Sequence, residues 1–303
     1  MALVNPKKFL KEARNNKKGV CALNAVNLET MTAIVSAADE VNTPVIVQCS
    51  EGAIKYAGLE NLASIAKNLG ETYKVDFALH LDHGSSLEMC KKCIDADFTM
   101  VMLDLSKAAF DENVKQTKEL VKYAHRRNVF VEAELGRLFG KEDNADDAES
   151  VFTNPALAHD FILKTGVDAL AISVGTSHGA YKLQIVDGLK QNIIKQIAEE
   201  NPETILVLHG ASHIDEDIVK KINALGGALK STSGISLTDE LEAIKNGITK
   251  INIDSDLRLA YTYGVRKFLK ENGTAFDIRN ITGAGISELK AEVSKKLNLF
   301  SKQ

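Results

Sequence analysis

The amino-acid sequence predicts an α/β fold, a (β/α)8 TIM barrel with extra helices at its C-terminal end. Short apolar runs rich in Val, Ile and Leu recur along the chain, and longer stretches with helical periodicity separate most of them. Nearly every apolar run finishes on a polar or charged residue. A parallel barrel explains these observations together, because it alternates strands with helices and collects the carboxyl ends of its strands at one face.

The apolar runs number eight, which is the number of strands that closes such a barrel. We expect strands at Val20 to Asn24, Pro44 to Ser50, Asp76 to Leu81, Thr99 to Asp104, Val129 to Leu135, Val167 to Val174, Thr204 to His209 and Thr249 to Asp254. A doubly wound open sheet shares the same alternation and is the structural alternative. The strand count favours the barrel.

Helical patterns fill most gaps between these runs. The clearest are Glu29 to Glu40, Asn61 to Leu69, Asn113 to Arg127 and Ile214 to Leu225. The segment Ser85 to Glu88 has the sequence of a capping box, and Gly247 is placed to end a helix before the last strand. The tail from Arg258 onward is expected to be helical and to pack outside the barrel or against a partner subunit.

The connection at Gly140 to Ser150 is polar, acidic and long for a loop that follows a strand. Long loops at such positions are often lids or binding loops. No low-complexity linker interrupts the chain. We therefore expect one domain over residues 1–303, with a mobile active-site loop around 139–152.

Composition limits the classes of function. The chain is 45% hydrophobic with a formal charge of -4, which allows a sizeable core and offers no basic stripe for a nucleic acid. Lys7, Lys8 and Lys11 are followed by no apolar signal region, and no apolar stretch has the length of a membrane span. We expect a cytoplasmic protein with no nucleic-acid or membrane partner.

Four cysteines are present, and two of them form a CxxC pair at Cys90 and Cys93. No second pair completes a zinc site. We interpret these two, with Cys21 and Cys49, as buried or half-buried thiols.

Three histidines, His83, His178 and His209, follow three different predicted strands. One histidine at a strand end is more often a structural residue than a ligand. Three neutral imidazoles that converge and leave a fourth position open suit a catalytic Zn²⁺. We expect His80, His125 and His159 to be structural, with His80 on a different face of its strand from the neighbours of His83.

Carboxylates accompany these histidines. Asp82 precedes His83 at the mouth of the barrel, where it can exchange a proton with a substrate hydroxyl near the metal or can orient a histidine. Glu132 and Glu134 lie two residues apart on one strand and point the same way. They fit an ion-pair network as readily as a catalytic site.

Small residues follow three of the strands, at Gly175 to Gly179, Gly210 to Ser212, and Asp254 with Ser255. Such barrels often build a phosphate site from backbone N–H groups and hydroxyls after their last strands. Arg258 and Lys182 could supply charge for a second phosphate.

Several segments closely resemble the class II, zinc-dependent fructose-bisphosphate and tagatose-bisphosphate aldolases, along nearly the whole chain. They are CALNAVNLET, PVIVQCSEGA, ALHLDHGSS, VMLDLS, VEAELGRLFGKED, FTNP, GVDALAISVGTSHGAYK, LVLHGAS and KINIDSDLRLA. The resemblance implies a Zn²⁺ cofactor on His83, His178 and His209, and proton transfer at the C4 hydroxyl by Asp82.

The resemblance also implies roles that spacing could not supply. Glu142, in the acidic loop, is implied to handle the proton at the dihydroxyacetone phosphate carbon, while Glu134 and Asp104 support the metal site. Lys182 is implied to bind a phosphate or a monovalent cation. The remaining implied substrate contacts are Asn24, Ser50, Gly179, Gly210, Ser212, Asn252, Asp254, Ser255 and Arg258.

The implied reaction is reversible cleavage of fructose 1,6-bisphosphate to dihydroxyacetone phosphate and glyceraldehyde 3-phosphate, by a homodimer or homotetramer. The metal would stabilise an enediolate without a covalent intermediate. The segment Asn252 to Arg258 resembles the NIDxDLR form of the fructose branch more than the NVATELK form of tagatose relatives. Tagatose 1,6-bisphosphate, a non-catalytic sugar-phosphate-binding role and a phosphosugar epimerase remain alternatives, and His ligands also accept Co²⁺ or Fe²⁺.

A Schiff-base aldolase is a further alternative, and it needs a lysine inside the barrel. We expect no predicted strand to carry one in its interior or at its C-terminal end, since Lys250 lies near the start of the eighth. Four positions depart from the family pattern without touching the proposed metal ligands: Lys107 follows Ser106 where His is frequent, Phe139 replaces Gly, Ala211 stands where Gly is common, and His213 follows Ser212.

Overall fold

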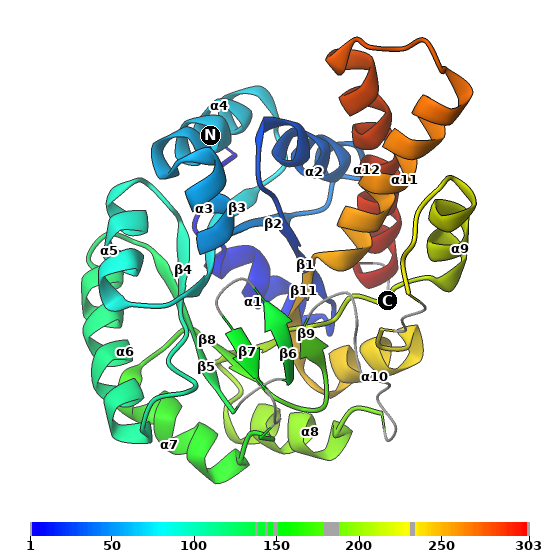
Figure 1. The fold of residues 1–303 in the computed structure, drawn as a ribbon. Helices are drawn as coiled ribbons and strands as arrows, with labels where there is room; N and C mark the ends of the chain where they lie inside the picture. The colour runs from blue at the N-terminus through cyan, green and yellow to red at the C-terminus, as the bar shows by residue number, and fades with distance from the viewer. Residues whose placement is uncertain are drawn as a thin grey trace.

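The fold is a closed barrel of eight parallel strands, as predicted. A computed structural model describes residues 2–136, 139–142, 145–147, 151–178, 188–230 and 234–301, with the backbone alone at 139–142, 145–147 and 178. Neighbouring strands follow the order β1, β11, β10, β8, β5, β4, β3, β2 (Figure 1). Their bounds are β1 Val20–Asn24, β2 Val45–Ser50, β3 Phe77–Gly84, β4 Met100–Leu103, β5 Phe130–Leu135, β8 Ala169–Ile172, β10 Ile205–Leu208 and β11 Ile248–Ile253. Closure excludes the doubly wound sheet.

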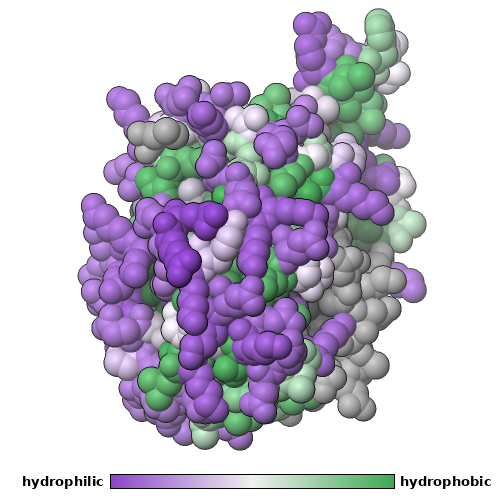
Figure 2. Space-filling view, turned by 90° about the vertical axis from the view of Figure 1, so that its left-hand side faces the viewer, coloured by the Kyte–Doolittle hydropathy of each residue, from purple (hydrophilic) through white to green (hydrophobic). Residues whose placement is uncertain are grey.

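Helices surround the barrel wherever the sequence predicted them. They are α1 Lys7–Asn15, α2 Leu28–Glu40, α3 Glu51–Ala57, α4 Leu59–Thr72, α5 Leu87–Asp95, α6 Phe110–His125, α7 Pro155–Thr165, α8 Gln191–Glu200, α9 Glu216–Ala224, α10 Leu237–Asn246, α11 Ser255–Glu271 and α12 Ile278–Ser301. Their outer faces over α5 and α6 are mainly hydrophilic (Figure 2). Among the described residues, no helix is both long and apolar enough to cross a membrane.

Two helix boundaries test the predicted caps. Gly247, with φ 129°, ends α10 as predicted. The predicted capping box at Ser85 to Glu88 does not form. Ser86 caps the helix instead, its hydroxyl accepting from the Met89 N–H at 3.2 Å, whereas the N–H of Ser85 donates to the Glu51 carboxylate. Ser86 becomes the cap because its backbone is extended, as a residue before the first helical turn requires.

The C-terminal tail is helical, as predicted. Helix α12 packs against α11 and α2, outside the barrel. Figure 1 shows the end of α11 and the start of α12 projecting beyond the body of the barrel.

The amino-terminal half of the barrel interior is apolar. Strands β1, β2, β3, β4, β5, β8 and β10 contribute to one buried cluster, which Phe9 and Leu10 of α1 also join. A larger apolar cluster lies between the strands and the helices. Strand β11 adds nothing to the inner cluster, because in the parallel register Lys250 stands beside Val20.

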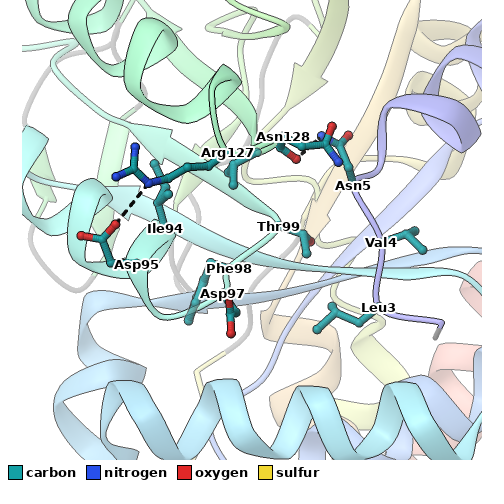
Figure 3. A pocket seen from close by; sticks show the side chains of 11 residues that line it. Leu3, Val4, Asn5, Ile94, Asp95, Asp97, Phe98, Thr99, Arg127 and Asn128 are labelled. Atoms are coloured by element: carbon teal, nitrogen blue, oxygen red, sulfur yellow. Dashed lines mark hydrogen bonds and ion pairs between the residues drawn. The ribbon is translucent and has the colours of Figure 1, made fainter.

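A pocket of about 620 Å³ opens at the amino-terminal end, beside Leu3 to Asn5 and Arg127 (Figure 3). Four of its residues form two polar pairs. Arg127 lies 3.5 Å from the Asp95 carboxylate, and Asn5 donates to the Asn128 carbonyl oxygen at 2.7 Å. These pairs indicate a structural role for this end.

The acidic stretch after β5 differs from the predicted loop. Strands β6 Phe139–Glu142 and β7 Ala145–Asp147 pair in antiparallel fashion, and β6 pairs in parallel with β9 Ser177–His178. Figure 1 shows this small sheet in front of the barrel's centre. The sequence missed it because three short strands carry no apolar alternation of their own, and their pairing depends on segments far apart in the chain.

Candidate active site

Polar side chains replace the apolar cluster toward the carboxyl ends of the strands. The inward positions there hold buried Gln48, His80, Asp82, Glu132, Glu134, His209, Lys250 and Asn252. Burial of so many polar groups is costly unless each has partners. Their contacts therefore define the candidate site.

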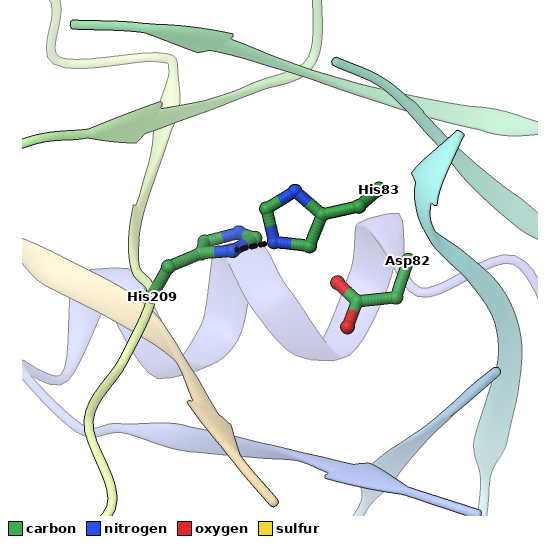
Figure 4. A group of neighbouring side chains, drawn as sticks. All are labelled: Asp82, His83 and His209. Atoms are coloured by element: carbon green, nitrogen blue, oxygen red, sulfur yellow. Dashed lines mark hydrogen bonds between the residues drawn. The ribbon is translucent and has the colours of Figure 1, made fainter. Parts of the chain in front are cut away.

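A bulge at the end of β3 brings Asp82 and His83 to the same site. Neighbouring residues of a regular strand point to opposite faces, but the register of β3 against β4 shifts between Leu81 and Gly84, and His83 has φ 49°. Bulges re-aim side chains in this way. Ligand atoms of Asp82, His83 and His209 consequently lie within 4.8 Å of one another (Figure 4).

The two histidine rings face each other edge to face, with Nε2 of His83 2.8 Å from Nδ1 of His209. Each ring is held by a carboxylate on its other nitrogen: His83 Nδ1 lies 2.8 Å from Asp104, and His209 Nε2 lies 2.8 Å from Glu132. Since a carboxylate only accepts hydrogen bonds, these outer nitrogens carry the protons of the neutral rings. The two facing nitrogens then both present lone pairs.

Two facing lone pairs repel unless a proton or a cation lies between them. Burial lowers the pKa of His209, and neighbouring His83 lowers it further, which disfavours an added proton. Tetrahedral Zn–N bonds of about 2.0–2.1 Å set ligand nitrogens roughly 3.3 Å apart, so a small movement of either ring would suffice. The donor set fits a divalent metal.

Asp82 is 1% exposed and accepts from three amides. Asn252 Nδ2 lies 3.2 Å from Oδ1, while Asn24 and Gln48 donate to Oδ2 at 3.2 and 3.0 Å. These donors fix the orientation of the carboxylate. Sequence reasoning missed Gln48, although it lies two residues before Ser50 on one strand and therefore shares its face.

Asp104 and Glu134 flank the other side of His83. One ligand atom each from His83, Asp104 and Glu134 lie within 4.8 Å of one another. Burial alone would raise the pKa of Asp104, but His83 and Ser106 outweigh it and hold that pKa below its usual range.

The three small-residue loops meet beside this group. A side chain at Gly210, where φ is 62°, would collide with the carbonyl of Ser177. The Ser212 hydroxyl accepts from the N–H groups of Asp254 at 3.3 Å and Ser255 at 3.1 Å. The loops after β8, β10 and β11 are therefore neighbours, as the phosphate-site prediction requires.

Two other predicted contacts lie at helix starts. Arg258, whose side chain is 64% exposed, pairs with Asp254 at 2.8 Å. Ser50 caps α3 by accepting from the Ala53 N–H.

Some predicted residues cannot be compared with the structure. Gly179 and Lys182 lie outside the described residues. For Glu142 and His178 the backbone is described, in β6 and β9, but the side chains are not.

The prediction for Lys250 was wrong. Its side chain is fully buried inside the barrel, 2.8 Å from Glu132 Oε2 and 2.8 Å from Asn252 Oδ1. It shares the inward face of β11 with Asn252, two residues later.

The prediction that His80 lies on a different face of its strand from the neighbours of His83 was also wrong. His80 and Asp82 share the inward face of β3, and His80 Nε2 lies 3.8 Å from Glu132. Burial would raise the pKa of Glu132, but Lys250 and His209 hold it well below its usual range.

The other expected structural residues match their predictions. His125 lies 2.7 Å from Asp168, and His159 lies 3.0 Å from Asn201. All four cysteines are free and buried, and burial raises the pKa of Cys21 to about 12.

Comparisons with known proteins extend over the same residues. The family described as "Fructose-bisphosphate aldolase class-II" matches residues 4–303. The chain is 41% identical to a fructose-bisphosphate aldolase of Helicobacter pylori strain J99, and 42% identical to one of Thermus caldophilus, over 98% of each chain in both cases. A crystal structure of a putative fructose-1,6-biphosphate aldolase from Coccidioides immitis superposes with a TM-score of 0.81 at 27% identity, over 98% of this chain and 96% of that one.

Proposed function

Since the chain belongs to the class II fructose-bisphosphate aldolase family, we propose here the residues and the metal through which it acts. Its activity is that of a fructose-bisphosphate aldolase, a lyase that breaks and forms the C3–C4 bond of fructose 1,6-bisphosphate. The main observation behind the proposal is that one ring nitrogen of His83, one ring nitrogen of His209 and one carboxylate oxygen of Asp82 lie within 4.8 Å of one another.

We propose that His83, His209 and His178 hold Zn²⁺, with Asp104 and Glu134 supporting the site. A divalent ion there supplies electrophilic polarisation of the substrate's ketone oxygen. Asp104 and Glu132 each fix one ring by accepting from its protonated nitrogen. They leave His83 Nε2 and His209 Nδ1 as the ligand atoms.

Asp82 accepts the proton of the C4 hydroxyl in this proposal. The C3–C4 bond then breaks, its electron pair stays on the three-carbon fragment that becomes dihydroxyacetone phosphate, and the aldehyde forms at C4. The three amides on Asp82 orient the carboxylate in a site that is nearly closed to solvent. Glu142 returns a proton to C3 while a moving segment around 139–152 excludes water.

The phosphates bind at the neighbouring loops after β8, β10 and β11, through Gly179, Gly210, Ser212, Asp254, Ser255 and Arg258. The start of α11 at Ser255 supports this position, because helix N-termini attract anions. Asn24, Ser50 and Asn252 contact the sugar, and Lys182 contacts a phosphate or a monovalent cation.

A Schiff-base mechanism requires a free amine at the substrate. The buried Lys250 ammonium instead pairs with Glu132 and donates to Asn252, which opposes nucleophilic attack. Borohydride treatment with substrate tests this directly, since a trapped covalent adduct on Lys250 would contradict the metal mechanism.

We further propose that residues 1–303 form one domain. We also propose that the protein is cytoplasmic and assembles as a homodimer or a homotetramer. Light scattering and sedimentation of the metal-loaded enzyme distinguish the two assemblies. A monomer would contradict the proposal.

The decisive experiment compares cleavage of fructose and tagatose 1,6-bisphosphates in a coupled triose-phosphate assay, before chelation, after it, and after Zn²⁺ is added back. We expect activity that favours fructose, is lost on chelation and is restored by zinc. A preference for tagatose 1,6-bisphosphate would change only the substrate that we assign to the enzyme. Activity that survives chelation would overturn the metal site.

A further inference from the structure

We propose that Lys250 and Glu132 are positioning residues, which join the metal ligand His209 to the proton acceptor Asp82 through one buried network. The inference rests on the proposed function, because it takes His209 as a ligand and Asp82 as the acceptor. Neither Lys250 nor Glu132 is placed to touch the substrate. Both are 0% exposed, beneath the residues that would.

The first branch runs from Lys250 to His209. Glu132 Oε2 lies 2.8 Å from the Lys250 ammonium, and Glu132 Oε1 lies 2.8 Å from His209 Nε2. The carboxylate thus forms an ion pair with Lys250, accepts a hydrogen bond from His209 and holds the proton of His209 on Nε2. Carboxylates that orient a histidine in this way tune metal sites in general.

The second branch runs from Lys250 to Asp82. The ammonium can only donate, so Asn252 must turn its carbonyl oxygen toward Lys250, at 2.8 Å. The amide nitrogen then faces Asp82, 3.2 Å from Oδ1. A flipped amide would set its nitrogen against the ammonium and its oxygen against the carboxylate, so Lys250 and Asp82 together fix which way Asn252 points.

Lys250 stands in register between two apolar residues of the inner cluster, Val20 of β1 and Val207 of β10. Replacing a buried ion pair with apolar groups is often neutral or stabilising. Stability alone therefore does not account for a lysine here. Its two short contacts, one on each branch, do.

The test uses a double variant, Lys250→Met with Glu132→Gln. Either single change leaves the other residue buried without its partner and could prevent folding; the double change removes both charges together. The matched control is Lys296→Met with Asp256→Asn, because Lys296 is 2% exposed and pairs with Asp256 of α11 at 2.7 Å, so this double change also removes one buried ion pair.

For the first branch, the measurement is the rate at which zinc passes from each protein to a coloured chelator. We expect the folded double variant to release zinc about 10 to 100 times faster than the wild type, because a neutral amide holds His209 less firmly. The control double variant, Lys296→Met with Asp256→Asn, should release it at the wild-type rate. A folded double variant with wild-type zinc release overturns the first branch.

For the second branch, the measurement is kcat of the double variant at saturating zinc and substrate. We expect a fall of about 10-fold or more with little change in KM, because Asn252 loses the contact that orients it toward Asp82. An unchanged kcat overturns this branch. A wild-type enzyme that binds no zinc, or works without it, would instead overturn the proposed function.

Discussion

The two ends of the barrel interior solve opposite problems. At the amino-terminal end, apolar side chains from most strands pack with Phe9 and Leu10, and four residues of the pocket outside them form two polar pairs. At the carboxyl end, carboxylates, amides and imidazoles are buried side by side, and His83 adopts a left-handed backbone conformation. The difference teaches that the amino-terminal end stabilises the fold, while the carboxyl end holds reactive groups in place at a cost in stability.

The largest effect of a single substitution is expected at Asp82, at the carboxyl end. We expect Asp82→Ala to lower kcat for cleavage by about 10² to 10⁴-fold, because the C4 proton loses its acceptor. Zinc content should stay at the wild-type level, since the histidine rings keep their own carboxylates. Kinetics with metal analysis check both parts. Retained cleavage would show that Asp82 is not the acceptor.

A change at the opposite end should have the converse effect. We expect Leu10→Ala to reduce the free energy of unfolding by about 2–5 kcal/mol, because it leaves a cavity under the barrel. The kcat of the folded protein should not change. Urea unfolding with activity assays measures both, and Leu163→Ala, at a residue 70% exposed, is the control. A fall in kcat would contradict the division between the two ends.

Backbone conformation at the carboxyl end can be tested separately from chemistry. His83→Gly should be about 1 kcal/mol more stable than His83→Ala, because the positive φ of residue 83 suits glycine better than alanine. Both variants lose the same imidazole, so the difference between their stabilities measures the cost of the backbone conformation. At His159, within α7, the order should reverse. Thermal unfolding measures both pairs, and equal stability at position 83 would argue against strain.

Acid should weaken the carboxyl end of the metal-free protein. The pKa of Asp104 is depressed in the folded state, so its ionised form stabilises the fold above its unfolded pKa of about 3.9. That contribution is lost as pH falls below that value toward the folded pKa. We expect the Tm of Asp104→Asn to depend less on pH below about 5 than that of the wild type. Glu88→Gln, at an exposed pair, is the control, and parallel profiles for all three proteins would refute the assignment.

The smallest effect is expected at the amino-terminal pocket. Asp95 and Arg127 are both about half exposed, at 56% and 44%, and such pairs contribute about 0–1 kcal/mol. Asp95→Ala should therefore change the unfolding free energy by less than about 1 kcal/mol and leave kcat unchanged. A measurable loss of activity would give this pocket a function that its pairing does not suggest.

The sequence was sufficient for the eight strands, because each is a mainly apolar run buried on both faces. It also predicted that Asp82, His83 and His209 lie together, since strand ends in a barrel converge. It could not reveal the bulge that lets Asp82 and His83 share a site. That feature depends on pairing with β4 rather than on local pattern.

The errors at Lys250 and His80 are both errors about the inward face. Lys250 was judged by its distance from the start of its strand, and for His80 the alternation was counted wrongly; counting in twos from Asn252 or Asp82 places both residues on the inward face. Gln48 was missed in the same way. Polar residues in the middle of a strand are hard to interpret from sequence, because their partners lie on other strands.

The facing nitrogens of His83 and His209 have a thermodynamic consequence. An ion that binds only the folded chain shifts the folding equilibrium by RT ln(1 + [L]/Kd), and the 2.8 Å between these two nitrogens places both within reach of one ion. Once the free ion exceeds Kd, each tenfold rise should add about 1.4 kcal/mol to the free energy of unfolding. The population of folded enzyme thereby becomes a reporter of the free metal around it.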